Sequence, residues 1–175
     1  MQVFKKSIGA VAAAALLLWN PAHTAAAEKP PAKAPVLNPA ARAAAQRGVK
    51  TCLGRVQEVS SFLGQGVDMG LFLFNPPADA NKKLFSLSAE SLGKDSLSYT
   101  SSSFAPTGNG CGAMYEAVTY WPASCSDVAA KAFPELTFAG PLLRNIQTLE
   151  GRGNLRVFLM PAGQGCVSIK KELIF

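Results

Sequence analysis

The sequence predicts a single α+β domain of two layers: a long N-terminal helix packed on an antiparallel sheet of about six to seven strands, with a second, short helix. Two observations support this fold. Apolar residues recur at spacings of three and four up to residue 63, and alternate with polar residues after residue 68. Short turns rich in glycine, proline and asparagine separate the later segments, which favours antiparallel neighbours over long crossovers.

The first residues have the features of a secretory signal. Two lysines precede the uncharged apolar run Ile8–Trp19, and Ala25 and Ala27 form an A-x-A cleavage site. The run is shorter than the ~20 residues that a membrane-spanning helix needs. A retained N-terminal anchor is the alternative, but the charged, proline-rich segment that follows favours cleavage. We therefore expect residues 1–27 to be a cleaved signal peptide.

A proline-rich linker and the long helix come next. Residues 28–38 contain three prolines among alanines and lysines, which predicts an extended linker. Asn38 followed by Pro39 is typical of a helix start, with asparagine as the N-cap. One apolar face then extends to Leu63, and the glycines that follow end the helix. This face comprises Val49, Cys52, Leu53, Val56, Val59, Phe62 and Leu63.

The remaining chain predicts seven strands and a short helix, and the domain is expected to span 39–175. Ser124, with Asp127 three residues later, has the capping-box spacing that begins a helix, and a proline at position 134 ends it. The predicted strands are 69–75, 84–90, 97–105, 113–121, 142–149, 154–160 and 166–174, and the predicted helix is 125–133.

The four cysteines predict two disulfides. They contain no C-x₂-C pair, and the export signal implies an oxidising compartment, so disulfides are favoured over a Cys₄ zinc site. Spacing alone leaves three pairings open. We favour Cys111–Cys166, because both residues lie in glycine-rich turns that open strands. That choice leaves Cys52–Cys125 as the second bridge.

Composition excludes several functions. The only histidine, His23, lies in the signal, so the mature chain lacks the imidazole that Ser-His-Asp and Cys-His catalysis require. Removing the signal leaves 15 basic and 11 acidic residues, a mild net charge of +4 with no basic patch typical of nucleic-acid binding. We expect no metal, no cofactor, no nucleic-acid partner and no transmembrane segment after cleavage.

Aromatic residues in the third and fourth predicted strands are the candidate binding site. Five aromatic residues cluster there: Tyr99, Phe104, Tyr115, Tyr120 and Trp121. If Tyr115 and Trp121 project from the face opposite the helix, they would form an exposed aromatic surface, and Tyr99 completes the aromatic candidates. Such a surface suits a sugar or a protein partner. Packing within the core is the alternative. Glu116 lies among these residues and completes the candidate set.

Glu116 also raises the possibility of catalysis. Two carboxylates suffice for glycoside hydrolysis, and Asp127 and Glu135 are close in sequence. A capping role already explains Asp127, however, so a small carboxylate-dependent glycan hydrolase remains the alternative function.

The favoured function is an exported, non-catalytic binding or accessory protein of the bacterial cell envelope, such as an inhibitor or assembly factor. We expect it to be periplasmic or secreted and to have a protein or glycan partner in the envelope. A remoter alternative is a small outer-membrane barrel, because the last predicted strand alternates and ends on Phe175.

Overall fold

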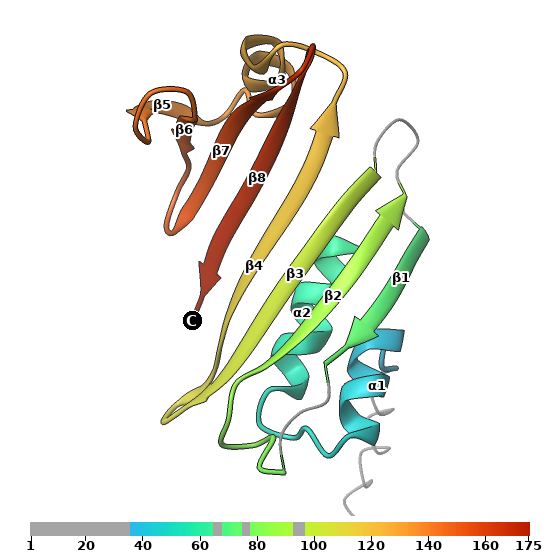
Figure 1. The fold of residues 1–175 in the computed structure, drawn as a ribbon. Coiled ribbons are helices and arrows are strands. Elements are labelled where there is room, and N and C mark those ends of the chain that lie inside the picture. Colours follow the sequence, from blue (N-terminus) through green and yellow to red (C-terminus); the bar gives the residue numbers. More distant parts are fainter. Residues whose placement is uncertain (1–35, 65–67, 75–77, 93–96) are drawn as a thin grey trace, which may run out of the picture. The chain divides into compact units, whose positions relative to one another are not determined.

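One antiparallel sheet dominates the computed structural model, which describes residues 36–64, 68–74, 78–92 and 97–175. Within these ranges, eight strands follow the order β1-β2-β3-β4-β8-β7-β6-β5 (Figure 1). The strands are β1 (Asp68–Leu73), β2 (Phe85–Leu92), β3 (Leu97–Thr107), β4 (Gly110–Trp121), β5 (Thr137–Pro141), β6 (Gln147–Glu150), β7 (Leu155–Ala162) and β8 (Gly165–Ile174). The expected signal peptide and most of the expected linker lie outside the described residues.

The predicted fold class was wrong in its helices and in its number of strands. The described residues form three short helices, α1 (Pro39–Gln46), α2 (Leu53–Leu63) and α3 (Cys125–Ala132), and no long N-terminal helix. None of these helices is long and apolar enough to cross a membrane.

A turn at Gly48 divides the predicted long helix into α1 and α2. Gly48 has a φ of 81°, a left-handed conformation that glycine adopts without strain. The Asn81 side chain holds this turn. Its Oδ1 accepts hydrogen bonds from the backbone N–H groups of Lys50 and Thr51 at 2.7 and 3.0 Å. Its Nδ2 donates to the Gly48 carbonyl oxygen at 3.0 Å. The apolar pattern continues through the turn, so periodicity alone does not reveal the break.

Both predicted helix caps are confirmed. The Asn38 Oδ1 accepts a hydrogen bond from the Ala41 N–H at 2.9 Å, which caps α1. The Asn38 Nδ2 also donates to the Ser60 Oγ at 2.9 Å, so the same residue links α1 to α2. The Ser124 Oγ accepts from the Asp127 N–H at 3.1 Å at the start of α3.

The predicted strand 142–149 is displaced, and the strand before it was missed. Residues 142–146 form a hairpin turn, and only Gln147–Glu150 pair as β6. The missed β5 contains Gly140, with a φ of 108°, and Pro141, and its register shifts at this point. Proline and glycine are tolerated there because β5 is an edge strand. The same residues hide it from a sequence-based reading.

Both buried cores lie on one side of the sheet. The first core packs α1 and α2 against β1–β4, and the second packs α3 against β6–β8. We call this side the covered face. In Figure 1 it is turned away from the viewer, with the helices behind the sheet. Its largest fully buried side chains in the sheet are Phe104, Tyr115, Val157 and Leu159.

The four cysteines form two disulfides, but the predicted pairing was wrong. The bridges are Cys52–Cys111 and Cys125–Cys166. In the ladder between β4 and β8, Cys166 pairs with Trp121, ten residues along β4 from Cys111. At about 3.4 Å per residue, the two predicted partners lie at opposite ends of a strand about 34 Å long. That separation is far beyond the ~7 Å that a disulfide permits between Cα atoms.

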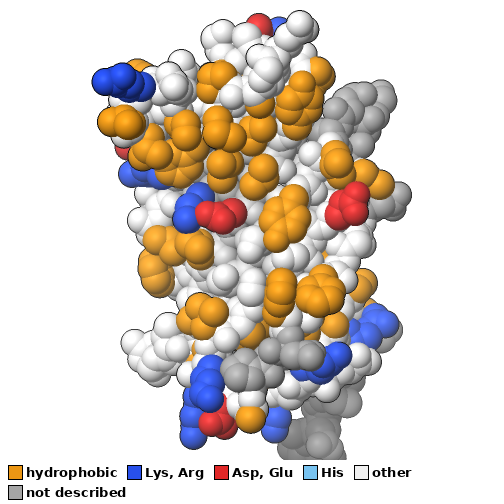
Figure 2. Space-filling view, viewed as in Figure 1, with side chains coloured by type: hydrophobic (Ala, Val, Ile, Leu, Met, Phe, Trp, Pro, Cys, Tyr) orange, Lys and Arg blue, Asp and Glu red, His pale blue; other side chains and the backbone are white. Residues whose placement is uncertain are grey.

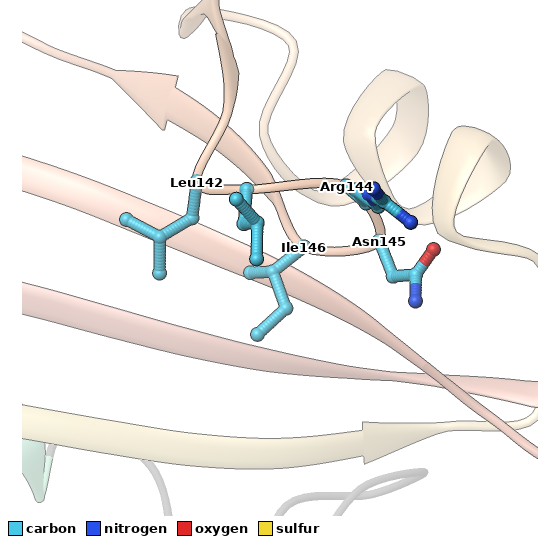
Figure 3. Close-up of a pocket in the computed structure, with 5 residues that line it drawn as sticks. Leu142, Arg144, Asn145 and Ile146 are labelled. Carbon is cyan, nitrogen blue, oxygen red and sulfur yellow. The ribbon is translucent and has the colours of Figure 1, made fainter.

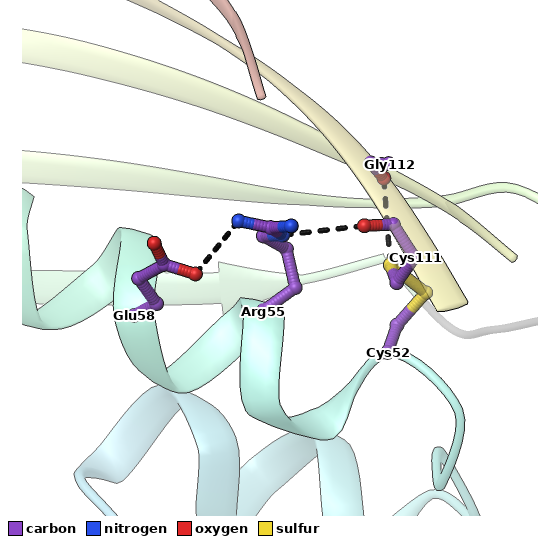
Figure 4. A network of polar contacts seen from close by, with 5 residues as sticks. All are labelled: Cys52, Arg55, Glu58, Cys111 and Gly112. Carbon is purple, nitrogen blue, oxygen red and sulfur yellow. Dashed lines mark hydrogen bonds and ion pairs between the residues drawn. A yellow bond between two sulfur atoms is a disulfide. The ribbon is translucent and has the colours of Figure 1, made fainter. Parts of the chain in front are cut away.

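Each disulfide joins a helix start to a strand start. Figure 4 shows Cys52, immediately before α2, bonded to Cys111 at the beginning of β4. Arg55 supports this junction: its Nε donates to the Cys111 carbonyl oxygen at 3.2 Å, and its Nη1 pairs with Glu58 at 2.8 Å. Cys125, at the start of α3, is bonded in the same way to Cys166 in β8.

The buried Ser102 hydroxyl leads to a first prediction. Ser102 is 1% exposed, and within the described part of the chain its Oγ has no hydrogen-bond partner. An unsatisfied buried polar group costs about 1–3 kcal/mol. We therefore expect Ser102→Ala to leave the free energy of unfolding unchanged or to raise it by about 1 kcal/mol in urea denaturation.

Ser60→Ala is the matched control for Ser102→Ala. The Ser60 Oγ donates to the Val56 carbonyl oxygen and accepts from Asn38, so its loss should destabilise by about 1 kcal/mol. Equal losses in both variants would contradict the assignment of Ser102 as unsatisfied.

Candidate binding surface

Strand alternation places two different sets of side chains on the two sides of the sheet. Directly paired residues share a side, so the register assigns each one. The row Ser102, Tyr115 and Glu172 points to the covered face. The neighbouring row Ser101, Glu116 and Lys171 points to the other side, which no described helix covers. We call this side the open face.

The open face carries a continuous apolar patch. Its members come from β2, β3, β4, β8 and β7 and occupy two adjacent rows of the ladder, in which only the β2 position opposite Tyr99, the exposed Glu90, is charged. All of them are exposed or half-buried, and Figure 2 shows hydrophobic side chains gathered on this side. The apolar patch consists of Leu92, Leu97, Tyr99, Val118, Tyr120, Phe158, Met160, Val167 and Ile169.

A row of polar residues borders the apolar patch. In the middle of this row, the Lys171 Nζ lies 2.6 Å from the Glu116 Oε1. Further along it, Arg156 pairs with Glu150 at 3.4 Å. In the next row beyond the polar one, Met114 and its ladder partner Leu173 are apolar. The open face therefore has apolar surface on both sides of one charged row, as Figure 2 shows around the central acid–base pair.

The four candidate residues from the sequence lie on opposite sides of the sheet. Tyr99 and Glu116 belong to the open face, where Tyr99 is 51% exposed and its hydroxyl lies 2.9 Å from the Ser88 Oγ. Tyr115 and Trp121 point to the covered face instead. The condition for one exposed aromatic surface, that Tyr115 and Trp121 project away from the helix, is not met.

Tyr115 is part of the first core. It is 1% exposed, its ring packs against Phe62 of α2 at 6.0 Å, and its hydroxyl donates to the Glu172 Oε2 at 2.7 Å. The Lys170 ammonium lies 5.2 Å from the centre of the same Phe62 ring. Burial of the phenol, followed by its hydrogen bond to Glu172, raises the pKa of Tyr115 above its usual value of 10.0.

This raised pKa predicts a loss of stability in alkali. Below pH 10, Tyr115 is neutral in both the folded and the unfolded chain, so the stability linked to it is fully present. Above pH 10 the unfolded chain releases the phenolic proton while the folded chain keeps it. The free energy of unfolding should then fall by about 1 kcal/mol per pH unit.

Urea denaturation between pH 8 and 11, compared with Tyr115→Phe, measures this loss. The variant should fall less steeply above pH 10 because it has no phenol to ionise. Parallel curves for the two proteins would show that Tyr115 does not carry the effect.

Trp121 packs at the second core beside α3. Its indole Nε1 donates to the Ser168 Oγ at 2.8 Å, and its ring meets Phe133 edge-on at 6.5 Å. It borders a hollow of about 410 Å³ that Val128 and Lys131 of α3 also line. The single polar group of Trp121, its indole N–H, is therefore used inside the fold.

Two of the three carboxylates considered for catalysis, Glu116 and Asp127, lie on opposite sides of the sheet. Glu116 is paired with Lys171 on the open face, whereas Asp127 lies in α3 on the covered side. The Ser124 hydroxyl, and then Lys131, lower the pKa of Asp127, which keeps it ionised and unsuited to donate a proton at neutral pH. Among the described residues, no group of three or more His, Cys, Asp or Glu side chains could hold a metal ion.

The turn between β5 and β6 is a separate exposed apolar feature. Leu142 and Leu143 are 65% and 83% exposed. Figure 3 shows Leu142 and Ile146 on one side of the turn, with Arg144 and Asn145 pointing away. Its shallow hollow of about 240 Å³ is lined by these five consecutive residues, so it brings together nothing distant in sequence.

Sequence reasoning missed most of the apolar patch. It singled out aromatic residues, whereas three of the four central residues of the patch are aliphatic, among them Val118 and its ladder partner Ile169. The signal was present in β8, where Val167, Ile169 and Leu173 alternate with polar residues. That alternation does not reveal which side of the strand the helices cover.

Known proteins add nothing to this geometry: a scan against protein-family models, a search of curated proteins and a search of solved structures each found no match.

Proposed function

We propose that this chain is an exported, non-catalytic binding protein of the bacterial cell envelope, acting as an accessory, inhibitor or assembly protein through its open face. The apolar patch carries the proposal. Its two rows across five strands span about 24 Å by 14 Å, and nine of the ten positions are apolar, which gives roughly 300 Å² before side-chain relief is counted. Contiguous exposed apolar areas of this size on a monomer are often functional.

The composition of the patch favours a protein partner over a glycan. Sugar sites combine aromatic faces with polar groups that hydrogen-bond hydroxyls. Here three of the four central residues, Val118, Ile169 and Val167, offer only aliphatic surface, and Tyr120 is the fourth. Tyr99, Phe158 and Met160 flank them, which matches the apolar core and aromatic enrichment of protein interfaces.

The two disulfides support a location outside the cytosol. Disulfides such as Cys52–Cys111 and Cys125–Cys166 persist in oxidising compartments and are rare in the cytosol. Together with the expected signal peptide, they lead us to propose a periplasmic or secreted protein.

Site-specific photo-crosslinking in the exporting cell tests this function. A photoreactive residue in place of Tyr120, 52% exposed on the open face, should give a discrete adduct. The same residue in place of the exposed Arg42 of α1 should not. Mass spectrometry identifies the adduct. The purified partner should then bind the wild type and lose binding to Val118→Asp.

Equal labelling from Tyr120 and Arg42 positions, or no adduct from either, would count against binding through the open face. A glycan adduct would keep the surface but change the class of partner.

A further inference from the structure

The open face is complementary to itself in polarity and charge. We propose that its partner is a second copy of this chain, packed face to face about a twofold axis that runs along the strands between β4 and β8. This inference rests on the proposed function, because it takes the open face as the binding surface and names what covers it. A twofold interface is self-complementary, so each residue must suit the residue that the axis places opposite it.

The ladder register specifies which residues would meet. An axis along the strands keeps the height of each row and exchanges its two sides. Strand β4 of one copy then lies over β8 of the other, β3 over β7, and β2 over β6. Packed sheets lie about 10 Å apart with mean strand directions within about 30° of each other, and an axis along the strands keeps the two directions aligned beside it.

The apolar rows would meet apolar rows. Nearest the axis, Val118 lies opposite the partner's Ile169, and Tyr120 opposite the partner's Val167. Both contacts follow from their direct pairing in the ladder. One strand further out, Tyr99 and Leu97 lie opposite Phe158 and Met160 of the partner subunit. On the other side of the charged row, Met114 lies opposite the partner's Leu173.

The charged row would meet its opposite charges. Glu116 lies opposite the partner's Lys171, and the twofold axis repeats this pair. Four side chains of alternating charge would then surround the axis. They would form two ion pairs within the chains and two between them. In the same row, the Ser101 hydroxyl lies opposite the partner's Arg156, which can donate to it.

A twofold axis across the strands through the charged row does not fit. It would place Glu116 opposite the partner's Glu116 and Lys171 opposite the partner's Lys171. It would also place Tyr99 over the polar Ser103 row. Like charges face to face in a buried interface are strongly unfavourable, so of these two axes the charged row favours the one along the strands.

The area is large enough for a stable dimer. From β2 to β7, five strands about 4.8 Å apart and eight residues of about 3.4 Å rise, together with the four residues of β6, cover roughly 700 Å² of one copy. Two copies would bury about 1,400 Å², within the standard size range of a specific protein interface.

Sedimentation equilibrium of the exported chain with both disulfides formed tests the dimer. Over about 1–100 µM the wild type should approach twice the mass of one chain. Val118→Asp buries an unpaired carboxylate opposite the partner's Ile169 and should weaken association at least about 100-fold. Leu143→Asp, on the β5–β6 turn outside the open face, should dimerise as the wild type does.

Charge reversal and its repair test the register itself. Glu116→Lys places four lysines around the axis and should weaken association about 100-fold. The double variant Glu116→Lys with Lys171→Glu restores both the intrachain and the interchain pairs, and should return association to within about threefold of the wild type. Circular dichroism and thermal melting at one dilute concentration confirm that each variant is folded.

The outcomes separate this inference from the proposed function. A monomer at all concentrations, together with an identified different partner crosslinked at the open face, would overturn the dimer and leave the binding function standing. A dimer that Val118→Asp and the charge reversal leave intact would overturn the proposed axis. A monomer with no crosslinked partner would overturn both.

Discussion

Replacing Cys52 and Cys111 together with alanine is expected to lower the free energy of unfolding by about 4 kcal/mol. The bridge closes a loop across a sequence separation of 59 residues. Restriction of the unfolded chain by a loop of that length accounts for about 4 kcal/mol. Urea denaturation at one protein concentration measures the loss. It is large relative to the 5–15 kcal/mol total that is typical of a domain.

The Cys125–Cys166 disulfide provides the matched control for the Cys52–Cys111 variant. Cys125→Ala with Cys166→Ala removes a bridge with a separation of 41 residues and should cost a similar amount. Each of these double variants keeps one intact disulfide, which non-reducing peptide mapping detects. Recovery of a peptide that joins Cys111 to Cys166 in the wild type would contradict the structure.

Phe104→Ala is expected to destabilise the chain by about 3–5 kcal/mol. Phe104 is 1% exposed, and its ring stacks on Phe85 across the ladder with centroids 5.3 Å apart. Truncation removes buried apolar surface and leaves a cavity between the sheet and its helices, and aromatic truncations in cores have losses of this size.

Phe138→Ala provides the comparison for Phe104→Ala. Phe138 lies on the edge strand β5 and is 63% exposed, so its truncation should change the free energy of unfolding by less than about 0.5 kcal/mol. Similar losses in the two variants would show that the first core does not lie between the helices and this face of the sheet.

Strand positions could be predicted from the sequence where alternation and turn residues agree. The strands around Phe85, Tyr99 and Val118 were placed within a few residues because buried and exposed positions alternate there. The break at Gly48 could not be predicted, because the turn depends on Asn81, which is distant in sequence. Long-range contacts of this kind leave no local period.

Neither the disulfide pairing nor the open face could be predicted, because the sequence does not reveal the strand order or the side of the sheet that the helices cover. Cys111 and Cys166 share a glycine-rich setting, but the order β4-β8 sends them to opposite ends of the pair. Tyr115 and Val118 lie on one strand and on opposite sides of it, and only the position of α2 decides which side is buried. The alternation in the sequence therefore identified most of the strands, whereas the packing of the helices defined the open face.

Methionine oxidation tests most directly whether the open face is covered at the proposed location of the protein in the cell envelope. Met114 and Met160 belong to the open face, whereas Met69 packs at the first core. In peroxide-treated envelopes, we predict that Met114 and Met160 oxidise several-fold more slowly in the wild type than in Val118→Asp, with Met69 equal in both. If each of the three methionines oxidises at the same rate in the wild type as in Val118→Asp, this result would contradict binding through the open face.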